Sequence, residues 1–162
     1  MTALLTIFTT PKPFSNPHIA VIQRNALRCW TSLGAEVQVL AIGEEEGLAE
    51  AAAELGVTLV PQVRRNAQGT PLVSDIFAQA RRHSNTPYLA YANADMLLLP
   101  EFVGITCLLG MSAPKFLAVG QRWDLDMVLA DGRTQQLTFE AGWDATTPPA
   151  LAPRAEIAGA LA

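Results

Sequence analysis

Stretches with strand character alternate four times with stretches of helical periodicity over the first 120 residues. Helices are expected between short β-rich runs at residues 3–8, 36–42, 57–60, 88–92 and 116–120. Strands joined by helical connections of this length pair in parallel through right-handed crossovers, which leave helices on both faces of the sheet. The alternation therefore predicts a single α/β domain with a mostly parallel sheet flanked by helices.

Local signals mark where the helices begin. Asn16-Pro17 and Thr70-Pro71 each place a capping side chain before a proline, which suits the first helical turn. The acidic run Glu44-Glu45-Glu46 is expected to open the second helix, and Pro100 the fourth. Helical spacing predicts inward-facing stripes of Val73, Ile76, Phe77 and Ala80 in the third helix, and of Phe102, Ile105 and Leu109 in the fourth.

The pattern changes after the fifth expected strand. Met127–Leu129 and Leu137–Phe139 flank Asp131-Gly132, which predicts a C-terminal β-hairpin. From residue 141 onward, 8 of 22 residues are Ala and 3 are Pro, with little periodicity. We therefore expect an α/β domain over residues 1–140 and a loosely packed or disordered tail over residues 141–162.

Composition excludes several classes of partner. Of the 162 residues, 50% are hydrophobic and 16% charged, and the net charge of -4 leaves no basic stripe for nucleic acid. No apolar run approaches the ~20 residues that span a bilayer, and the N-terminus lacks the basic start of a signal peptide. We expect a cytoplasmic protein with no membrane span, in which Cys29 and Cys107 are buried thiols.

Polar side chains follow every expected strand. In an open parallel sheet, ligands bind beyond the carboxyl ends of the strands. Any one of these residues alone would more often be an ordinary loop residue, but together they converge on one edge. They are Thr9, Thr10 and Lys12 after the first strand, Gly43 and Glu44 after the second, Arg65 and Asn66 after the third, Asn93 and Asp95 after the fourth, and Gln121, Arg122 and Asp124 after the fifth.

Asp95 gives the most specific signal. Its carboxylate stands between the apolar runs Tyr88–Ala92 and Met96–Leu99, the second of which is expected to continue the strand. Burial there costs free energy unless the carboxylate is paired, hydrogen-bonded or bound to a cation. Mg²⁺ or Mn²⁺ takes one or two carboxylates together with phosphate oxygens, and Asn93 could add a carbonyl contact. The alternative is that Asp95 caps a neighbouring loop.

Other phosphate-binding motifs are missing from the sequence. No Gly-x-Gly-x-x-Gly follows the first strand, and there is no Gly-Lys-Ser/Thr phosphate loop. A nucleotidyltransferase would want a basic, glycine-rich loop after the first strand, where only Lys12 is found. That class of enzyme is the least expected of those considered.

A family resemblance adds to this reading. Arg65–Thr70, a helix, Thr86–Asp95 and Leu98–Phe102 together resemble the nucleotide-sugar half of family 2 glycosyltransferases, and the resemblance covers roughly Leu4 to Arg122. It implies a Rossmann-like fold of the glycosyltransferase-A type, a nucleoside-diphosphate sugar as donor, and an acceptor that the sequence does not identify. It would place Thr9 and Thr10 beside the nucleoside, Glu44 near the base or ribose, Arg65 and Asn66 over the nucleotide, and Asp95 with Asn93 at the metal and diphosphate.

Two features bear on whether the chain catalyses transfer. Asn93 stands where the family usually has the first acid of Asp-x-Asp, which lowers the charge of the site. Inverting transfer needs a general base, and Asp124 and Asp126 are the candidates, although Asp124 could equally pair with Arg122. The first hypothesis is a metal-assisted glycosyltransferase, and the alternative is a non-catalytic nucleotide-binding or interaction module. A homo-oligomer is compatible with either.

Overall fold

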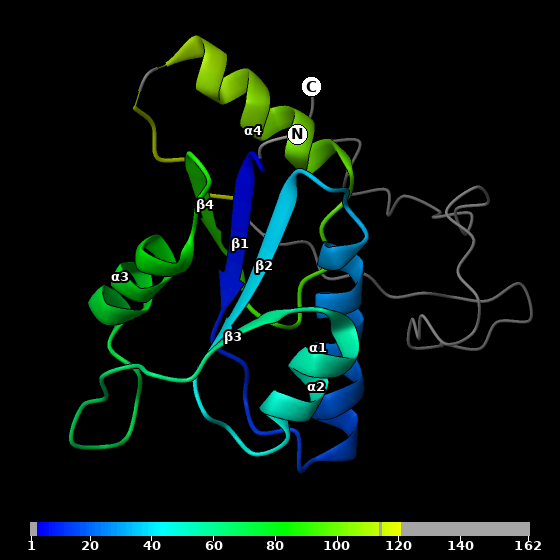
Figure 1. Ribbon diagram of the computed structural model, residues 1–162, viewed down its shortest axis with the longest axis vertical. Coiled ribbons are helices and arrows are strands. Elements are labelled where there is room, and N and C mark those ends of the chain that lie inside the picture. The colour runs from blue at the N-terminus through cyan, green and yellow to red at the C-terminus, as the bar shows by residue number, and fades with distance from the viewer. Residues whose placement is uncertain (1–2, 114, 121–162) are drawn as a thin grey trace, which may run out of the picture. The chain divides into compact units, whose positions relative to one another are not determined.

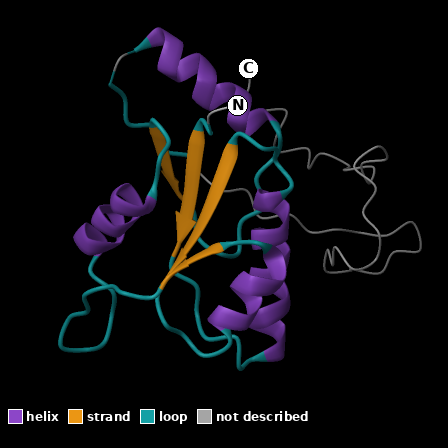
Figure 2. Cartoon of the chain, in the orientation of Figure 1, coloured by secondary structure: helices purple, strands orange, loops and turns teal. Residues whose placement is uncertain are grey.

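The computed structural model describes residues 3–113 and 115–120, which belong to one compact unit, Met1–Gln121. Four strands alternate with four helices in this part of the chain (Figure 1). Coloured by type, the strands form a central layer between helices (Figure 2). The elements are β1 (Leu5–Thr9), α1 (Pro17–Thr31), β2 (Val37–Ile42), α2 (Leu48–Leu55), β3 (Thr58–Val60), α3 (Val73–His83), β4 (Tyr88–Tyr91) and α4 (Glu101–Ser112).

The four strands form one all-parallel sheet in the order β3-β2-β1-β4. Leu5 of β1 is in register with Val37 of β2 on one side and with Tyr88 of β4 on the other. The chain moves outward from β1 to β3 and then returns to the far side of β1. The sheet is Rossmann-like, and its topological switch point lies between β1 and β4.

The handedness of the crossovers explains which helix covers which face. Right-handed connections that step from β1 to β2 to β3 place α1 and α2 on the same face. The connection to β4 steps the opposite way, so α3 lies on the other face. Figure 1 shows this separation, and the packing of α1 on α2 and of α3 on β2 agrees with it. The α/β prediction, with helices on both faces of a parallel sheet, is confirmed.

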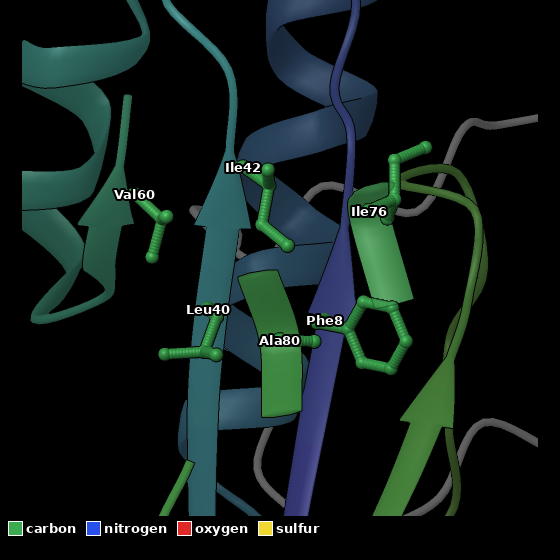
Figure 3. Packing of buried hydrophobic residues seen from close by; sticks show 6 residues of the cluster. All are labelled: Phe8, Leu40, Ile42, Val60, Ile76 and Ala80. Atoms are coloured by element: carbon green, nitrogen blue, oxygen red, sulfur yellow. The ribbon is translucent and has the colours of Figure 1, made fainter. Parts of the chain in front are cut away.

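The core on the α3 face brings together buried side chains from β1, β2, β3 and α3 (Figure 3). Burying a large aliphatic or aromatic side chain stabilises a fold by about 1.5–3 kcal/mol, so this cluster fixes α3 on the sheet. All five residues of β1 are buried, as expected for a strand with neighbours on both sides and a helix on each face. The cluster consists of Phe8, Leu40, Ile42, Val60, Ile76 and Ala80.

Helix boundaries follow the local signals in part. The Asn16 side chain accepts hydrogen bonds from the His18 and Ile19 amides, which confirms the predicted N-cap. The prediction that Glu44–Glu46 open α2 is wrong, because the helix starts only at Leu48, after Gly47 turns the chain at φ 76°. These acidic residues therefore lie in the loop after β2.

The start of α3 also differs from the prediction. Thr70-Pro71 does not cap the helix, because Leu72 holds the N-cap position and Pro71 forms an antiparallel bridge with Arg65. The proline restrains the loop before the helix instead. Pairing of Pro71 with Arg65 thus places Arg65 at the base of this loop.

The predicted inward stripes are only partly right. In α3, Ile76 and Ala80 are buried, but Val73 is 68% exposed and Phe77 is 44% exposed. The helix instead turns Asp75 and Gln79 inward, where Asp75 accepts hydrogen bonds from the loop after β3. In α4 the buried residues are Val103 and Thr106, whereas the predicted Ile105 is exposed, and Cys107 is also exposed.

Two predicted strand segments are not strands. Residues 116–120 form no strand, and Leu117 and Val119 are 90% and 88% exposed, so this apolar run is not packed into the sheet. The run after β4 also leaves the sheet. Two side chains of α1 donate hydrogen bonds to its carbonyls, Trp30 to Met96 and Cys29 to Leu98, and these bonds draw the run to α1.

The predicted hairpin around Asp131-Gly132 and the tail over residues 141–162 lie outside the described residues. None of the helices in the described part of the chain is long and apolar enough to cross a membrane.

Candidate functional site

The carboxyl ends of β1 and β4 lie side by side at the topological switch point, and we call this region the β1–β4 edge. It comprises Thr9, Thr10, Tyr91, Asn93 and Asp95. The Ala92 amide donates to the Phe8 carbonyl over 3.2 Å, which extends the parallel pairing beyond the last residue of β4. The residues that follow the two strands are therefore neighbours, as the sequence predicted.

Thr9 is the innermost polar residue of this edge. It pairs with Ala41 of β2 and is fully buried. Its hydroxyl Oγ1 has no hydrogen-bond partner among the described residues. Since a buried hydroxyl without a partner destabilises a fold by about 1–3 kcal/mol, Thr9 is suited to bond an ordered water, and its full burial keeps it from direct contact with a ligand.

Thr10 follows at the surface of the edge. Its hydroxyl lies 3.4 Å from the Tyr91 hydroxyl. This is a long hydrogen bond, in which either hydroxyl could be the donor. Thr10 directly follows β1 and Tyr91 ends β4, so the two hydroxyls bridge the switch point. Tyr91 was not among the residues singled out from sequence, where it is indistinguishable from the other apolar positions of the strand.

Asp95 is in a different setting from the one expected. β4 ends at Tyr91, and the Met96 amide donates to the Asn93 carbonyl over 3.1 Å to close a turn. Asn93 and Asp95 are both exposed in this turn. The prediction that Asp95 is buried is therefore wrong, because its side chain is exposed in the turn. Both side chains remain accessible to a ligand.

Helix α1 holds the segment that follows this turn. The buried Trp30 donates its Nε1 proton to the Met96 carbonyl over 2.9 Å. The adjacent Cys29 donates its thiol proton to the Leu98 carbonyl over 3.2 Å, and burial raises the pKa of that thiol. These two contacts restrain the chain directly after Asp95.

A second group of charged residues lies at the end of β2. Arg65 donates through Nη2 to Glu45 Oε1 over 2.6 Å and through Nη1 to the Gly69 carbonyl over 2.8 Å. A Cβ added to Gly43 would lie 3.8 Å from the same Nη2, so the guanidinium sits against the backbone at the end of the strand. The predicted Glu44 is exposed, and its neighbour Glu45 holds Arg65.

Asn66 shapes the loop that carries Arg65. Its side-chain oxygen accepts the amide protons of Gln68 over 3.0 Å and of Thr70 over 2.9 Å. This Asx-type turn occupies the carbonyl oxygen within the loop. The amide nitrogen of Asn66 is the group it could offer to a ligand.

Asp75 anchors the same loop from α3. Its carboxylate accepts the Arg64 amide over 2.7 Å and the Arg64 Nε over 2.9 Å. The backbone hydrogen bond, followed by the guanidinium bond, lowers the pKa of Asp75. An open surface hollow of about 590 Å³ lies beside this pair, lined by Glu44, Pro61, Gln62, Val63, Arg64, Asp75 and Gln79.

The described residues offer few metal ligands. No group of three or more His, Cys, Asp or Glu side chains among them is placed to hold a metal ion. Asp95 and Asn93 supply one carboxylate and one amide oxygen. This fits an ion such as Mg²⁺ that keeps several waters and takes phosphate oxygens, and does not fit an ion held by protein ligands alone.

The structure thus brings the predicted residues together at one edge of the sheet in two groups. Thr9, Thr10, Asn93 and Asp95 lie at the ends of β1 and β4, and Glu44 and Arg65 lie at the end of β2. With strands about 4.8 Å apart, the ends of β2 and β4 are separated by roughly 10 Å. Asp124 and Asp126 lie outside the described residues.

Three contributing residues were missed from sequence: Glu45, Asp75 and Tyr91. Glu45 is the middle member of an acidic run, and nothing in the run distinguishes it. Asp75 had a recognisable signal, since an acidic side chain in the first turn of a helix can reach back to the preceding loop. A helix that starts at Thr70-Pro71, as predicted, would put Asp75 beyond the first turn and hide this signal.

The fold and the site together define an α/β protein with a Rossmann-like parallel sheet and a polar carboxyl edge. No protein-family model matches the chain, and no curated protein matches its sequence.

Proposed function

We propose that this chain binds a nucleoside-diphosphate sugar at the carboxyl edge of its sheet and acts as a glycosyltransferase. The observation that carries the proposal is the strand order β3-β2-β1-β4, which puts the switch point between Thr9-Thr10 and the Asn93–Asp95 turn. Ligands of open α/β sheets bind at such points. The order and spacing of the family 2 glycosyltransferase motifs support the same assignment.

Two ends of the ligand fit the two groups of residues. Arg65, Glu45 and the loop around Asn66 lie over the end of β2 and offer hydrogen bonds to the nucleoside or its phosphate. The β1–β4 edge offers the Thr10 hydroxyl and the exposed Asn93 and Asp95 side chains. A separation of roughly 10 Å between the strand ends suits a nucleoside diphosphate that spans them.

Mg²⁺ or Mn²⁺ is the cofactor that this ligand would bring. Such an ion offsets the negative charge that develops on the departing nucleoside diphosphate. In this chain, Asp95 would hold the ion through its carboxylate, and Asn93 through its carbonyl or a water. Most of the coordination would come from phosphate oxygens and water, because only one carboxylate is contributed.

The donor-binding part of this proposal is tested by calorimetric titration with UDP, GDP, ADP and CDP in the presence and absence of Mn²⁺. We expect one of these diphosphates to bind in the micromolar to millimolar range, more tightly with Mn²⁺. Absence of binding by all four would remove the support for a nucleotide site.

Catalysis is tested separately, by measuring donor-sugar hydrolysis. Asp124→Asn or Asp126→Asn should lower turnover by roughly 10²–10⁴-fold while leaving donor binding nearly intact, since a general base acts in the transition state. Activity that neither substitution affects would refute this choice of base.

A non-catalytic nucleotide-binding module is the second candidate. It is favoured by the amide of Asn93 at a position where an acid would strengthen metal binding, which leaves Asp95 as the single carboxylate of the turn. Nucleotide binding without sugar transfer or donor hydrolysis above background would select this module over the enzyme.

A further inference from the structure

Two aromatic rings are exposed next to each other beside the β1–β4 edge. Phe77 of α3 and Tyr91 of β4 are each 44% exposed, although both are large apolar side chains. Their ring centroids lie 6.1 Å apart with an interplanar angle of 33°. The two exposed rings are therefore adjacent and only moderately tilted to each other, and we call the pair the Phe77–Tyr91 platform.

The platform is supported from below by the core. Phe8 is fully buried, and its ring meets Phe77 edge to face at 5.0 Å and 87°, and Tyr91 at 5.5 Å and 62°. Edge-to-face contacts of this kind are worth about 0.5–1.5 kcal/mol beyond the area buried. Phe8 belongs to the core cluster (Figure 3). Both exposed rings therefore contact a side chain that the core holds in place.

The position of the platform ties it to the ligand edge. Tyr91 is the last residue of β4, two residues before Asn93, and Phe8 is the penultimate residue of β1. The Thr10 hydroxyl lies 3.4 Å from the Tyr91 hydroxyl. An aromatic surface with hydroxyl groups along one rim therefore lies beside the proposed diphosphate position.

We propose that the Phe77–Tyr91 platform binds the apolar face of a sugar ring. A pyranose presents C–H bonds on one face and hydroxyls around its edge. The negatively polarised faces of aromatic rings attract the C–H face, and the rim hydroxyls of Thr10 and Tyr91 can bond the sugar hydroxyls. The sugar could belong to the nucleotide donor or to a carbohydrate acceptor, and the two sources share this chemistry.

Binding of the donor sugar by the platform rests on the proposed function, whereas binding of a free glycoside does not.

The chain offers a matched control for both kinds of binding. Phe116 and Tyr88 form a second exposed-to-intermediate aromatic pair, 5.5 Å apart and tilted by 37°, at the opposite end of β4. Phe77→Leu removes one ring of the platform, and Phe116→Leu removes a ring of similar setting far from the carboxyl edge.

The chain contains two tyrosines, Tyr88 and Tyr91, which lie at the two ends of β4. Incorporation of 3-fluorotyrosine into the full chain therefore gives two ¹⁹F resonances, one at the platform and one that serves as an internal reference. The glycoside probe is methyl β-D-glucopyranoside. The nucleotide probes are UDP and GDP, each compared with UDP-glucose, UDP-N-acetylglucosamine and GDP-mannose.

If the platform takes the donor sugar, one sugar nucleotide should bind about fivefold more tightly than its diphosphate, and Phe77→Leu should abolish that difference without changing the affinity for the diphosphate. If it takes an acceptor, the free glycoside should shift the Tyr91 resonance saturably and leave Tyr88 unmoved, and Phe77→Leu should abolish the shift. Phe116→Leu should leave both results unchanged.

Three results would overturn the inference. The first is that neither the glycoside nor any donor sugar responds to Phe77→Leu, and the second is that Phe116→Leu has the same effect as Phe77→Leu. The third is that Phe77→Leu weakens binding of UDP or GDP alone, which would make the platform a nucleobase site. A glycoside-induced shift of the Tyr91 resonance without any nucleotide binding would contradict the proposed function and support sugar binding by the platform. UDP binding without any response of the platform to the glycoside or to a donor sugar would support the nucleotide site and contradict the platform.

Discussion

Arg65 donates a 2.6 Å hydrogen bond to Glu45 at the carboxyl end of β2, although the two residues come from different loops. The pair is partly buried, with 27% and 23% of the two side chains exposed. The Arg64–Asp75 bonds and the Arg65–Pro71 bridge hold the loop independently of Glu45. Arg65 is therefore positioned by the fold and is not merely paired on the surface.

Replacement of Arg65 should weaken nucleotide binding and have a smaller effect on the free energy of unfolding. We expect Arg65→Gln to raise the Kd for the preferred nucleoside diphosphate by about tenfold, because a charge-assisted bond to the ligand is lost. Arg82→Gln, at the exposed end of α3, is the control and should leave the Kd unchanged. Equal Kd values for the two variants in calorimetric titration would contradict the placement of Arg65 at the ligand.

Trp30 should matter for both stability and the Asp95 turn. Trp30→Phe keeps an aromatic ring but removes the donor to the Met96 carbonyl, and should lower the free energy of unfolding by about 1–3 kcal/mol. Cys29→Ala removes the weaker thiol donor to Leu98 and should cost less. Urea unfolding of both variants measures the difference. A larger loss for Cys29→Ala would mean that Trp30 is not the main restraint on this segment.

Much of the fold was predictable because its signals are local. The Asn16 cap is satisfied by the amides two and three residues later, and Gly56 ends α2 in the left-handed conformation that glycine adopts without strain. The strand runs were recognisable from β-branched residues and turn residues at their ends. The parallel pairing then followed from the alternation of strand and helix.

The errors arose where a long-range contact decides the outcome. Met96–Leu99 has the composition of a strand, but hydrogen bonds from Trp30 and Cys29, more than 65 residues earlier, hold it on α1. Phe77 fits the helical stripe, yet α3 turns Asp75 inward because its carboxylate bonds the Arg64 amide. Sequence periodicity carries no information about such partners.

The candidate site was predictable at the level of which loops meet, because parallel strands bring their carboxyl ends to one edge. The individual roles within those loops were not. Glu45 holds Arg65 where Glu44 had been predicted to contact the ligand, and the exposure of Asp95 depends on where β4 ends. One residue of shift in a loop changes which side chain faces the ligand.

Asp75 should make stability depend on pH in acid. Its hydrogen bonds to Arg64 lower its pKa in the folded state below the unfolded value of about 3.9. The stabilisation is therefore complete above the unfolded pKa and is lost as the pH falls through the folded pKa. We expect Asp75→Asn to unfold at lower urea concentration than wild type from pH 5 to pH 7, with the gap closing below about pH 4. A gap of constant size from pH 3 to pH 7 would contradict this role.

Gly47, in the loop after β2, should be less replaceable than Gly56, at the end of α2. It has φ 76°, and an added Cβ would lie 2.8 Å from the Phe14 Cβ. Gly56 has φ 66°, but a Cβ there would meet nothing within 4 Å. Gly56→Ala should cost about 1 kcal/mol from backbone strain alone, and Gly47→Ala should cost more because strain and the clash add. Equal losses of thermal stability in the two variants would show that Phe14 does not pack against Gly47.

The proposed function requires a metal-bound diphosphate to lie against the Asn93–Asp95 turn. The measurement that tests it most directly is the Kd of the preferred nucleoside diphosphate with and without Mn²⁺, for wild type, Asp95→Ala and Asn93→Ala. Both substituted side chains are exposed in one turn. A carboxylate offers the cation a full negative charge and an amide only a dipole. Asp95→Ala should therefore abolish the Mn²⁺ dependence and Asn93→Ala should only reduce it, whereas equal effects, or a Kd indifferent to Mn²⁺ in wild type, would contradict the claim.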